Sequence, residues 1–141
     1  MTIEALSAQD ALVAVMLATS AADEAMTDRE LISITSIVDL LPVFRGYDHD
    51  RVHQVSGMVS DLFTEEDGLD ALLGLVEAAL PDHLRETAYA LACDVAAADG
   101  RVAMSELRML EELRHELHVG RLAAAAIERG ARARHQRLEP R

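Results

Sequence analysis

An internal repeat constrains the fold of this chain more strongly than any other feature of its sequence. Residues 21–31 and 97–107 align without a gap at an offset of 76 residues. Each segment predicts the end of one helix, a tight acidic turn and the start of the next helix. The register continues upstream, where Ala14 aligns with Ala90. Two such copies predict a pair of equivalent helical hairpins that pack about an approximate two-fold axis.

The rest of the chain also predicts helices. Apolar residues recur at helical spacing, and no segment alternates as a half-buried strand does. We therefore expect an all-α fold of about seven helices, in one domain that covers residues 1–141. Residues 121–141 would form an Arg-rich last helix and a frayed tail. The helices are expected at about 3–22, 27–41, 48–63, 64–80, 81–98, 104–119 and 121–134.

Local signals set several of these boundaries. Pro42 and Gly46 stop the second helix, and Asp48 is a suitable N-cap for the third. Thr64 opens an acid-rich run that predicts the start of the fourth helix. Pro81 fits the first turn of the fifth, where its missing N–H costs nothing. Gly120 is expected to end the sixth helix in a left-handed conformation.

The composition determines what the core is made of. Half of the residues are hydrophobic, but there are only two Tyr, two Phe and no Trp. The core must therefore consist of Ala, Leu, Val, Ile and Met. The single cysteine, Cys93, rules out an internal disulfide and is expected to be a small buried residue of the fifth helix. Asp94, at the edge of the same apolar stripe, needs a partner, and an Arg is the most ordinary one.

The charge of −12 is divided unevenly along the chain. Residues 1–120 hold 23 acidic residues and seven arginines, whereas residues 121–141 hold six arginines and two glutamates. The acidic body argues against nucleic acid as a partner and favours cations or basic protein surfaces. The Arg-rich end is interpreted as a solvated helix end, a strap across the acidic body or a contact for anionic lipid. Its few apolar anchors limit it to peripheral membrane association.

The cellular location follows from similar arguments. No apolar run approaches the ~20 residues that span a bilayer, and the first residues lack the basic segment of a secretory signal. Together with the single cysteine, this predicts a cytoplasmic protein.

The second repeat copy also carries a family resemblance. Residues 90–102 end in Ala97-Ala98-Asp99-Gly100, and Glu106 follows Asp99 by seven residues. This segment resembles the hallmark of the TerB-type tellurite-resistance family. The resemblance implies an all-helical domain with an acidic surface near the paired turns, and a binding role beside other stress-response and tellurite-resistance proteins. The chain departs from the family pattern at Glu24, where Gly is usual, and at Ala103, where Ser or Thr often caps the helix.

Four carboxylates at the paired turns form the candidate metal site. Hard cations such as Ca²⁺ and Mg²⁺ prefer oxygen ligands from Asp and Glu, and Zn²⁺ also accepts carboxylates. The four would converge on one divalent cation if the two turns face each other. The candidate ligands are Asp23, Glu30, Asp99 and Glu106.

The same carboxylates also have a purely structural interpretation. Thr27 and Glu30 have the Ser/Thr-x-x-Glu spacing of a capping box, which explains Glu30 completely. Glu106 lacks this explanation, because Ala103 cannot return the hydrogen bond. If either copy keeps its Glu for function, the second copy is the better candidate. A scaffold without metal, in which the carboxylates are caps and a docking surface, is therefore the alternative function.

A helical di-metal enzyme is the third alternative. Glu112 and His115 have the Glu-x-x-His spacing of di-iron bundles, and His49 and His53 lie one helical turn apart. The remaining ligands of such a site are missing, and no catalytic motif is evident. We therefore expect a binding protein and no enzyme. The partner, and whether the chain forms a homodimer, stay open.

Overall fold

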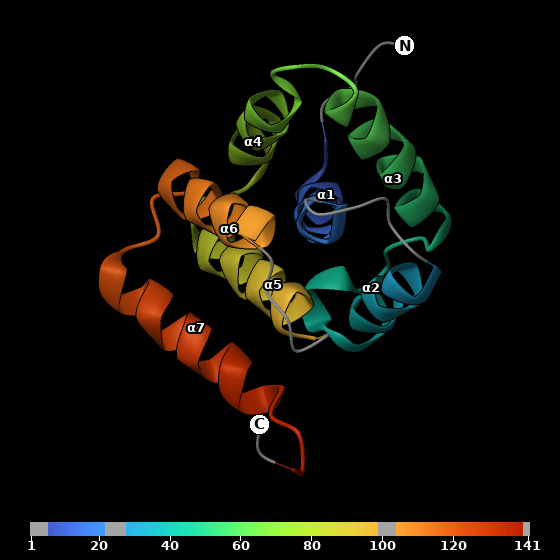
Figure 1. Cartoon of the computed structure of the whole chain (residues 1–141). Helices are drawn as coiled ribbons and strands as arrows, with labels where there is room; N and C mark the ends of the chain where they lie inside the picture. Colours follow the sequence, from blue (N-terminus) through green and yellow to red (C-terminus); the bar gives the residue numbers. More distant parts are fainter. Residues whose placement is uncertain (1–5, 22–27, 99–103, 140–141) are drawn as a thin grey trace.

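The computed structural model describes residues 6–21, 28–98 and 104–139 of the chain (Figure 1). These residues form seven α-helices and two short 3-10 helices and contain no strand, so the all-α prediction is confirmed. The helices are α1 (Ala8–Ala21), α2 (Asp28–Leu40), η1 (Pro42–Phe44), α3 (Asp50–Phe63), α4 (Gly68–Ala79), η2 (Asp82–Leu84), α5 (Arg85–Ala97), α6 (Met104–Glu116) and α7 (Arg121–Arg134).

Helix α1 is the centre of the fold. Figure 1 shows it surrounded by α2, α3, α4 and α5, and it packs most extensively on α5 and α3. Ten consecutive residues, from Asp10 to Thr19, are buried. A helix that is apolar on all sides requires such an environment. The helical spacing of apolar residues predicted this helix, and the structure shows in addition that neighbours cover every face of it.

The start of α1 is set by a capping box that the sequence analysis did not recognise. The backbone N–H of Asp10 donates to Ser7 Oγ at 3.0 Å, and the N–H of Ser7 donates to Asp10 Oδ2 at 3.3 Å. This reciprocal pair satisfies two donors that the first turn of a helix leaves open. The predicted start at residue 3 was wrong, because this cap places the first helical residue at Ala8.

The boundary signals after α1 are partly confirmed. Helix α2 ends before Pro42, and Gly46 has a left-handed φ of 80°. Asp48 caps the turn before α3 through an Oδ1 contact of 2.9 Å with the N–H of Asp50, but His49 occupies the N-cap position itself. Pro81 precedes η2, so α5 begins only at Arg85.

The turn between α3 and α4 differs from the prediction. Thr64 does not start α4, since its hydroxyl donates to the carbonyl of Asp61 at 2.7 Å and ends α3. The chain folds back so tightly that a Cβ at Gly68 would lie 1.9 Å from the carbonyl oxygen of Leu62. The acidic residues 65–67 therefore belong to the turn, and α4 starts at the glycine that permits this close approach.

The end of α6 is also different from the prediction. Gly120 is extended, with φ −66° and ψ 160°, and is the N-cap of α7. The left-handed residue is His118, with a φ of 56°. Its N–H donates to the carbonyl of His115 at 3.2 Å, and the N–H of Val119 donates to that of Arg114 at 3.1 Å. This is the Schellman pattern of helix termination, with His118 in the place usually taken by Gly.

The two repeat copies meet through their first helices. Helix α1 belongs to the hairpin α1–α2, helix α5 belongs to α5–α6, and α1 and α5 pack against each other. Their outer surroundings differ, because α7 lies along the side of α5 that faces away from α1 (Figure 1). The second copy therefore carries an extra helix, and this asymmetry shapes the surface described below.

Candidate functional site

The two predicted glutamate ligands occupy equivalent places in the repeat. Glu30 lies in the first turn of α2 and Glu106 in the first turn of α6. Glu106 is buried, with 8% of its surface exposed, and Glu30 is half-buried. The other two predicted ligands, Asp23 and Asp99, lie outside the described residues. Convergence of the four carboxylates therefore stays a prediction.

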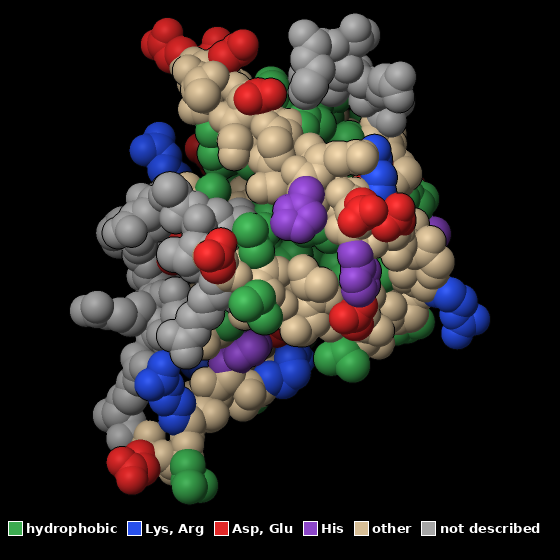
Figure 2. All heavy atoms as spheres, turned by 90° about the vertical axis from the view of Figure 1, so that its right-hand side faces the viewer, with side chains coloured by type: hydrophobic (Ala, Val, Ile, Leu, Met, Phe, Trp, Pro, Cys, Tyr) green, Lys and Arg blue, Asp and Glu red, His purple; other side chains and the backbone are tan. Residues whose placement is uncertain are grey.

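The residues of the di-metal alternative are all described, and they do not form a site. No three of the described His, Cys, Asp and Glu residues lie close enough together to hold a metal ion. His53 and His115 are exposed, and Nε2 of His49 contacts Oδ1 of Asp39. Figure 2 shows the face over α2 and α3, where imidazoles and carboxylates are interspersed with apolar side chains.

A buried carboxylate that the sequence analysis missed anchors the region before α3. Asp10 is 3% exposed. It accepts from Arg51 Nη2 at 2.5 Å, from Arg51 Nε at 3.3 Å and from the Tyr47 hydroxyl at 2.7 Å. Burial alone would raise the pKa of Asp10, but the hydrogen bonds from Arg51 and Tyr47 outweigh burial and hold the pKa below its usual range. All acceptor positions face protein donors, so the network fixes residues 47–51 to α1.

Two polar contacts join α7 to α5. Arg134 Nη2 lies 2.6 Å from Asp94 Oδ1, and the Tyr89 hydroxyl donates to Glu128 Oε2 at 2.6 Å. The predicted Arg partner of Asp94 is therefore confirmed. His135 Nε2 lies 3.4 Å from the same Asp94 oxygen. The Arg-rich segment thus lies as a strap along α5, one of the interpretations that the sequence left open.

Cys93 is buried beside this strap, as predicted. Burial raises the pKa of its thiol to about 12. Because the thiolate is the reactive form, a thiol with this pKa is a poor nucleophile near neutral pH. Its role in the fold is packing within the apolar core.

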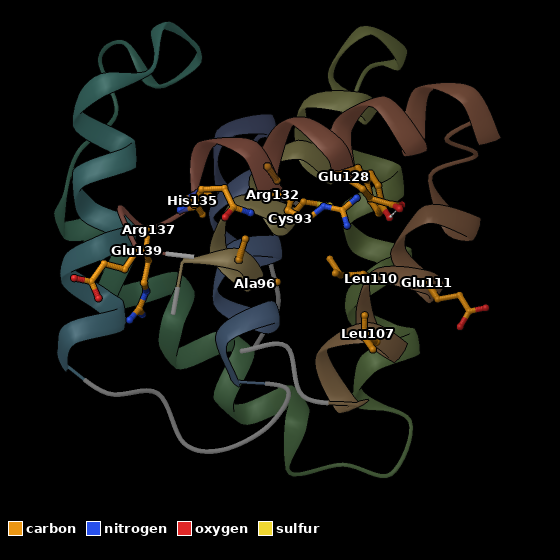
Figure 3. A pocket seen from close by; sticks show the side chains of 14 residues that line it. Cys93, Ala96, Leu107, Leu110, Glu111, Glu128, Arg132, His135, Arg137 and Glu139 are labelled. Carbon is orange, nitrogen blue, oxygen red and sulfur yellow. Dashed lines mark hydrogen bonds between the residues drawn. The ribbon is translucent and has the colours of Figure 1, made fainter. Parts of the chain in front are cut away.

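An open cleft of about 760 Å³ lies between α5, α6 and α7. Figure 3 shows Leu107 and Leu110 on its α6 side, and Arg132 and His135 extending from the end of α7. The cleft was not predicted, because it depends on how these three consecutive helices pack and not on any local pattern of residues. The described residues that line it are Tyr89, Cys93, Ala96, Ala97, Leu107, Leu110, Glu111, Glu128, Ala131, Arg132, His135, Gln136, Arg137 and Glu139.

Comparison with known families identifies the chain. The family model described as tellurite resistance protein TerB matches residues 9–129. The chain belongs to the TerB family. The resemblance predicted from the second acidic turn is thereby confirmed, and the match extends from α1 into α7. No curated protein and no solved structure gives a significant match to this TerB-family chain.

The TerB match ends inside α7, so part of the cleft lies beyond it. His135, Arg137 and Glu139 line the cleft but fall outside residues 9–129. None of the described helices of this TerB protein is both long and apolar enough to cross a bilayer.

Proposed function

We propose that this TerB-family protein is a cation-responsive interaction module in tellurite resistance or the general stress response. Family membership supports the tellurite-resistance role at the level of the module. The cation would be a divalent ion, such as Ca²⁺, Mg²⁺ or Zn²⁺, held between the paired turns. Its ligands would be Asp23, Glu30, Asp99 and Glu106.

The recurrence of an Asp–Glu pair at equivalent places of both repeat copies carries the proposal. In the second copy Glu106 lies in the first turn of α6 and is buried, with 8% of its surface exposed. The repeat supplies an equivalent Glu30, half-buried at the start of α2. A cation shared by both hairpins accounts for an Asp–Glu pair in each copy.

Such a site would couple cation binding to partner recognition. Four carboxylates brought together repel one another at neutral pH, and a divalent ion offsets that repulsion. Binding would then tie the starts of α2 and α6 together and make the acidic face less negative. The preferred partners are basic surfaces of other stress-response or tellurite-resistance proteins, or a second copy of the chain. A cytoplasmic location is part of this proposal.

Calorimetric titration with Ca²⁺, Mg²⁺, Mn²⁺ and Zn²⁺ tests the site. We expect saturable binding of at least one ion, lost in Glu106→Gln and in the double variant Asp23→Ala with Asp99→Ala. Glu65→Gln, in the exposed turn before α4, is the matched control and should bind as the wild type does. Circular dichroism of each variant checks the fold. Absent binding, or binding that survives the double variant, would show the site to be wrong.

The second candidate is a scaffold without metal, which the strong charge of residues 1–120 favours. In this case the acidic face binds a basic partner directly, with affinity that falls as salt rises. Pull-down from lysate with and without EDTA separates the two functions. Partner capture that EDTA leaves unchanged favours the scaffold, and capture that EDTA abolishes favours the cation-responsive module.

A further inference from the structure

Helix α7 has an outer side that the rest of the bundle does not cover. It packs on α5, and Figure 1 shows it at the edge of the bundle. Ala124 and Ala131 belong to the buried core, whereas Leu122 is 86% exposed. Residues four and eight positions apart share one side of a helix, and on this side of α7 all of them are exposed. This α7 outer face consists of Arg121, Leu122, Ala125 and Arg129.

The charges of the α7 outer face are positive and unpaired. No described carboxylate lies within ion-pair distance of Arg121 or Arg129. The one acidic residue of the helix, Glu128, accepts the hydroxyl of Tyr89 at 2.6 Å, so its carboxylate is directed towards α5. Arg121 and Arg129 are eight residues apart, which separates them by about 12 Å along the helix axis. A partner for this face needs negative charges at a similar spacing.

Helix α4 presents a surface of that kind. Residues 64–80 hold five acidic residues and no basic one. Asp70 and Glu77 share one side of α4 and are seven residues, or about 10 Å, apart along the axis. A Cβ at Gly74, between them, would meet nothing within 4 Å, so a second helix can approach the backbone closely. This α4 outer face consists of the exposed residues Asp70, Ala71, Gly74 and Ala78 and the half-buried Glu77.

The carboxylates of the α4 outer face also lack a cationic partner. No described basic residue lies within ion-pair distance of Asp70 or Glu77. Glu77 instead lies beside Glu116 of α6, and a hydrogen bond with Glu77 is the main reason that the pKa of Glu116 is raised. The nearby His118 lowers this pKa but does not cancel the effect of Glu77. Because an incoming guanidinium would pair with these carboxylates and offset their repulsion, the α4 outer face favours an arginine-bearing partner.

The two faces of one molecule do not meet. Helices α4 and α7 lie at different edges of the bundle (Figure 1), and contacts from Arg134 to Asp94 and from Tyr89 to Glu128 hold α7 on α5. A second copy, in contrast, brings an acidic α4 to a basic α7, and each set of charges gains its complement. An anionic membrane would pair with the arginines but leave the α4 carboxylates without a partner. The charges therefore favour a second copy as the occupant.

We infer that the α7 outer face of one molecule binds the α4 outer face of a second copy, with its arginines paired to Asp70 and Glu77 and Leu122 packed on the small residues around Gly74. Because this contact joins two different surfaces, the assembly closes into a ring or grows with concentration. The inference names one partner for the interaction module proposed above and rests on that role. Neither face contains a ligand of the proposed cation site.

Sedimentation equilibrium of the full chain tests the inference. One helix-on-helix contact is smaller than a standard interface of about 1,600 Å², so we expect association only at about 100 μM protein or more. At about 0.15 M salt the weight-average mass should then rise above the 15.4 kDa of one chain, and about 1 M salt should reverse this. Methyl resonances of Leu122 should shift with protein concentration, and those of Leu138, also exposed but outside both faces, should not. A mass that stays that of one chain would overturn the inference.

Charge variants of each face locate the contact. Arg121→Gln with Arg129→Gln removes charge from the α7 outer face, and Asp70→Asn with Glu77→Gln removes charge from the α4 outer face. Each double variant alone should associate about tenfold more weakly than the wild type. A mixture of the two should associate as the wild type does, because each variant keeps the face that the other lacks. A mixture that associates no better than either variant alone would overturn the pairing of α7 with α4.

Matched control variants remove the same charge from exposed positions outside both faces. They are Arg45→Gln with Arg137→Gln for the α7 variant, and Glu86→Gln with Glu111→Gln for the α4 variant. Both controls should associate as the wild type does, and circular dichroism checks the fold of every variant. If a control and its matched variant had equal effects, the contact would be non-specific charge attraction and the inference would be wrong.

Two further measurements separate this contact from the cation site and from a membrane. EDTA and Glu106→Gln should leave self-association unchanged, and Arg121→Gln with Arg129→Gln should keep cation binding. Loss of association in EDTA would assign it to the cation site. Flotation with phosphatidylglycerol vesicles tests the other occupant. Vesicle binding that Arg121→Gln with Arg129→Gln abolishes, in a protein that stays monomeric, would assign the α7 outer face to a membrane.

Discussion

The guanidinium of Arg51 donates to both carboxylate oxygens of the buried Asp10, at 2.5 Å from Nη2 to Oδ2 and 3.3 Å from Nε to Oδ1. Asp10 also forms half of the capping box that starts α1. One side chain therefore sets the start of the central helix and fixes the segment before α3 against it. We therefore expect loss of this pair to lower the stability of the whole helical bundle.

Arg51→Met should destabilise the protein. It leaves the Asp10 carboxylate buried with only Tyr47 and Ser7 as donors. Removing one partner of a buried pair costs about 3–5 kcal/mol, and the partly exposed Arg51 side chain lowers our expectation to about 2 kcal/mol. Urea denaturation at pH 7 measures the change. Arg45→Met, at an exposed position in the same region, should change stability little, and an equal loss in both variants would contradict the role of the pair.

The stability that Asp10 supplies should depend on pH. The folded-state pKa of Asp10 lies below its usual value of 3.8, so its contribution is present above that value and is lost as the pH falls through the folded pKa. Asp10→Asn should therefore be less stable than the wild type at pH 7. The difference in stability between the two proteins should narrow below about pH 4, because the Asp10 carboxylate of the wild type is then protonated and carries no charge, like the amide of Asn. Urea midpoints of both proteins from pH 7 to pH 2.5 measure this, and a constant difference would contradict it.

His118→Gly should stabilise the protein. A left-handed conformation costs an ordinary residue about 1–2 kcal/mol, and the greater flexibility of Gly in the unfolded chain returns part of the gain. We expect a net increase of about 0.5 kcal/mol, measured by thermal denaturation. His118→Val should reverse the sign, since a branched side chain tolerates φ 56° poorly. Gly120→Ala, at an extended position with open space around it, should not destabilise.

Gly68→Ala should be among the most damaging single-methyl additions in the chain. The new Cβ would meet the backbone oxygen of Leu62 at 1.9 Å, so the turn between α3 and α4 must shift. We expect a loss of about 2 kcal/mol in urea denaturation. Gly74→Ala, in α4 with nothing within 4 Å, is the matched control and should gain about 0.7 kcal/mol from helix propensity. Similar results for the two variants would show that the turn is not tightly constrained.

The helices were predictable where the signal is local. The periodic stripes of α3 and α5 and the acidic helix starts of the repeat arise from residues a few positions apart, so the sequence alone located those elements. His118 shows the limit of that approach. Gly120, two residues later, was the expected left-handed residue because Gly adopts this conformation most readily, whereas the hydrogen bonds that end α6 place His118 there and make Gly120 the N-cap of α7.

The features of the candidate sites were less predictable. Ser7 and Asp10 have recognisable capping-box spacing, but nothing local shows that Arg51, 41 residues away, completes the network. The cleft was also not predictable, since Leu107 on α6 and Arg132 on α7 line it together only because both helices pack around α5. The arginine partner of Asp94 was predicted by residue type, whereas its identity as Arg134 needed the docking of α7 along α5.

The central place of α1 has a consequence for synthesis of the chain. Its largest packing partner, α5, lies more than 60 residues later in the sequence. As the chain leaves the ribosome, an all-round apolar helix is therefore made well before the surface that buries it. Helices α3 and α4 can cover part of α1 earlier, but the face that packs on α5 stays exposed to water until α5 has been made.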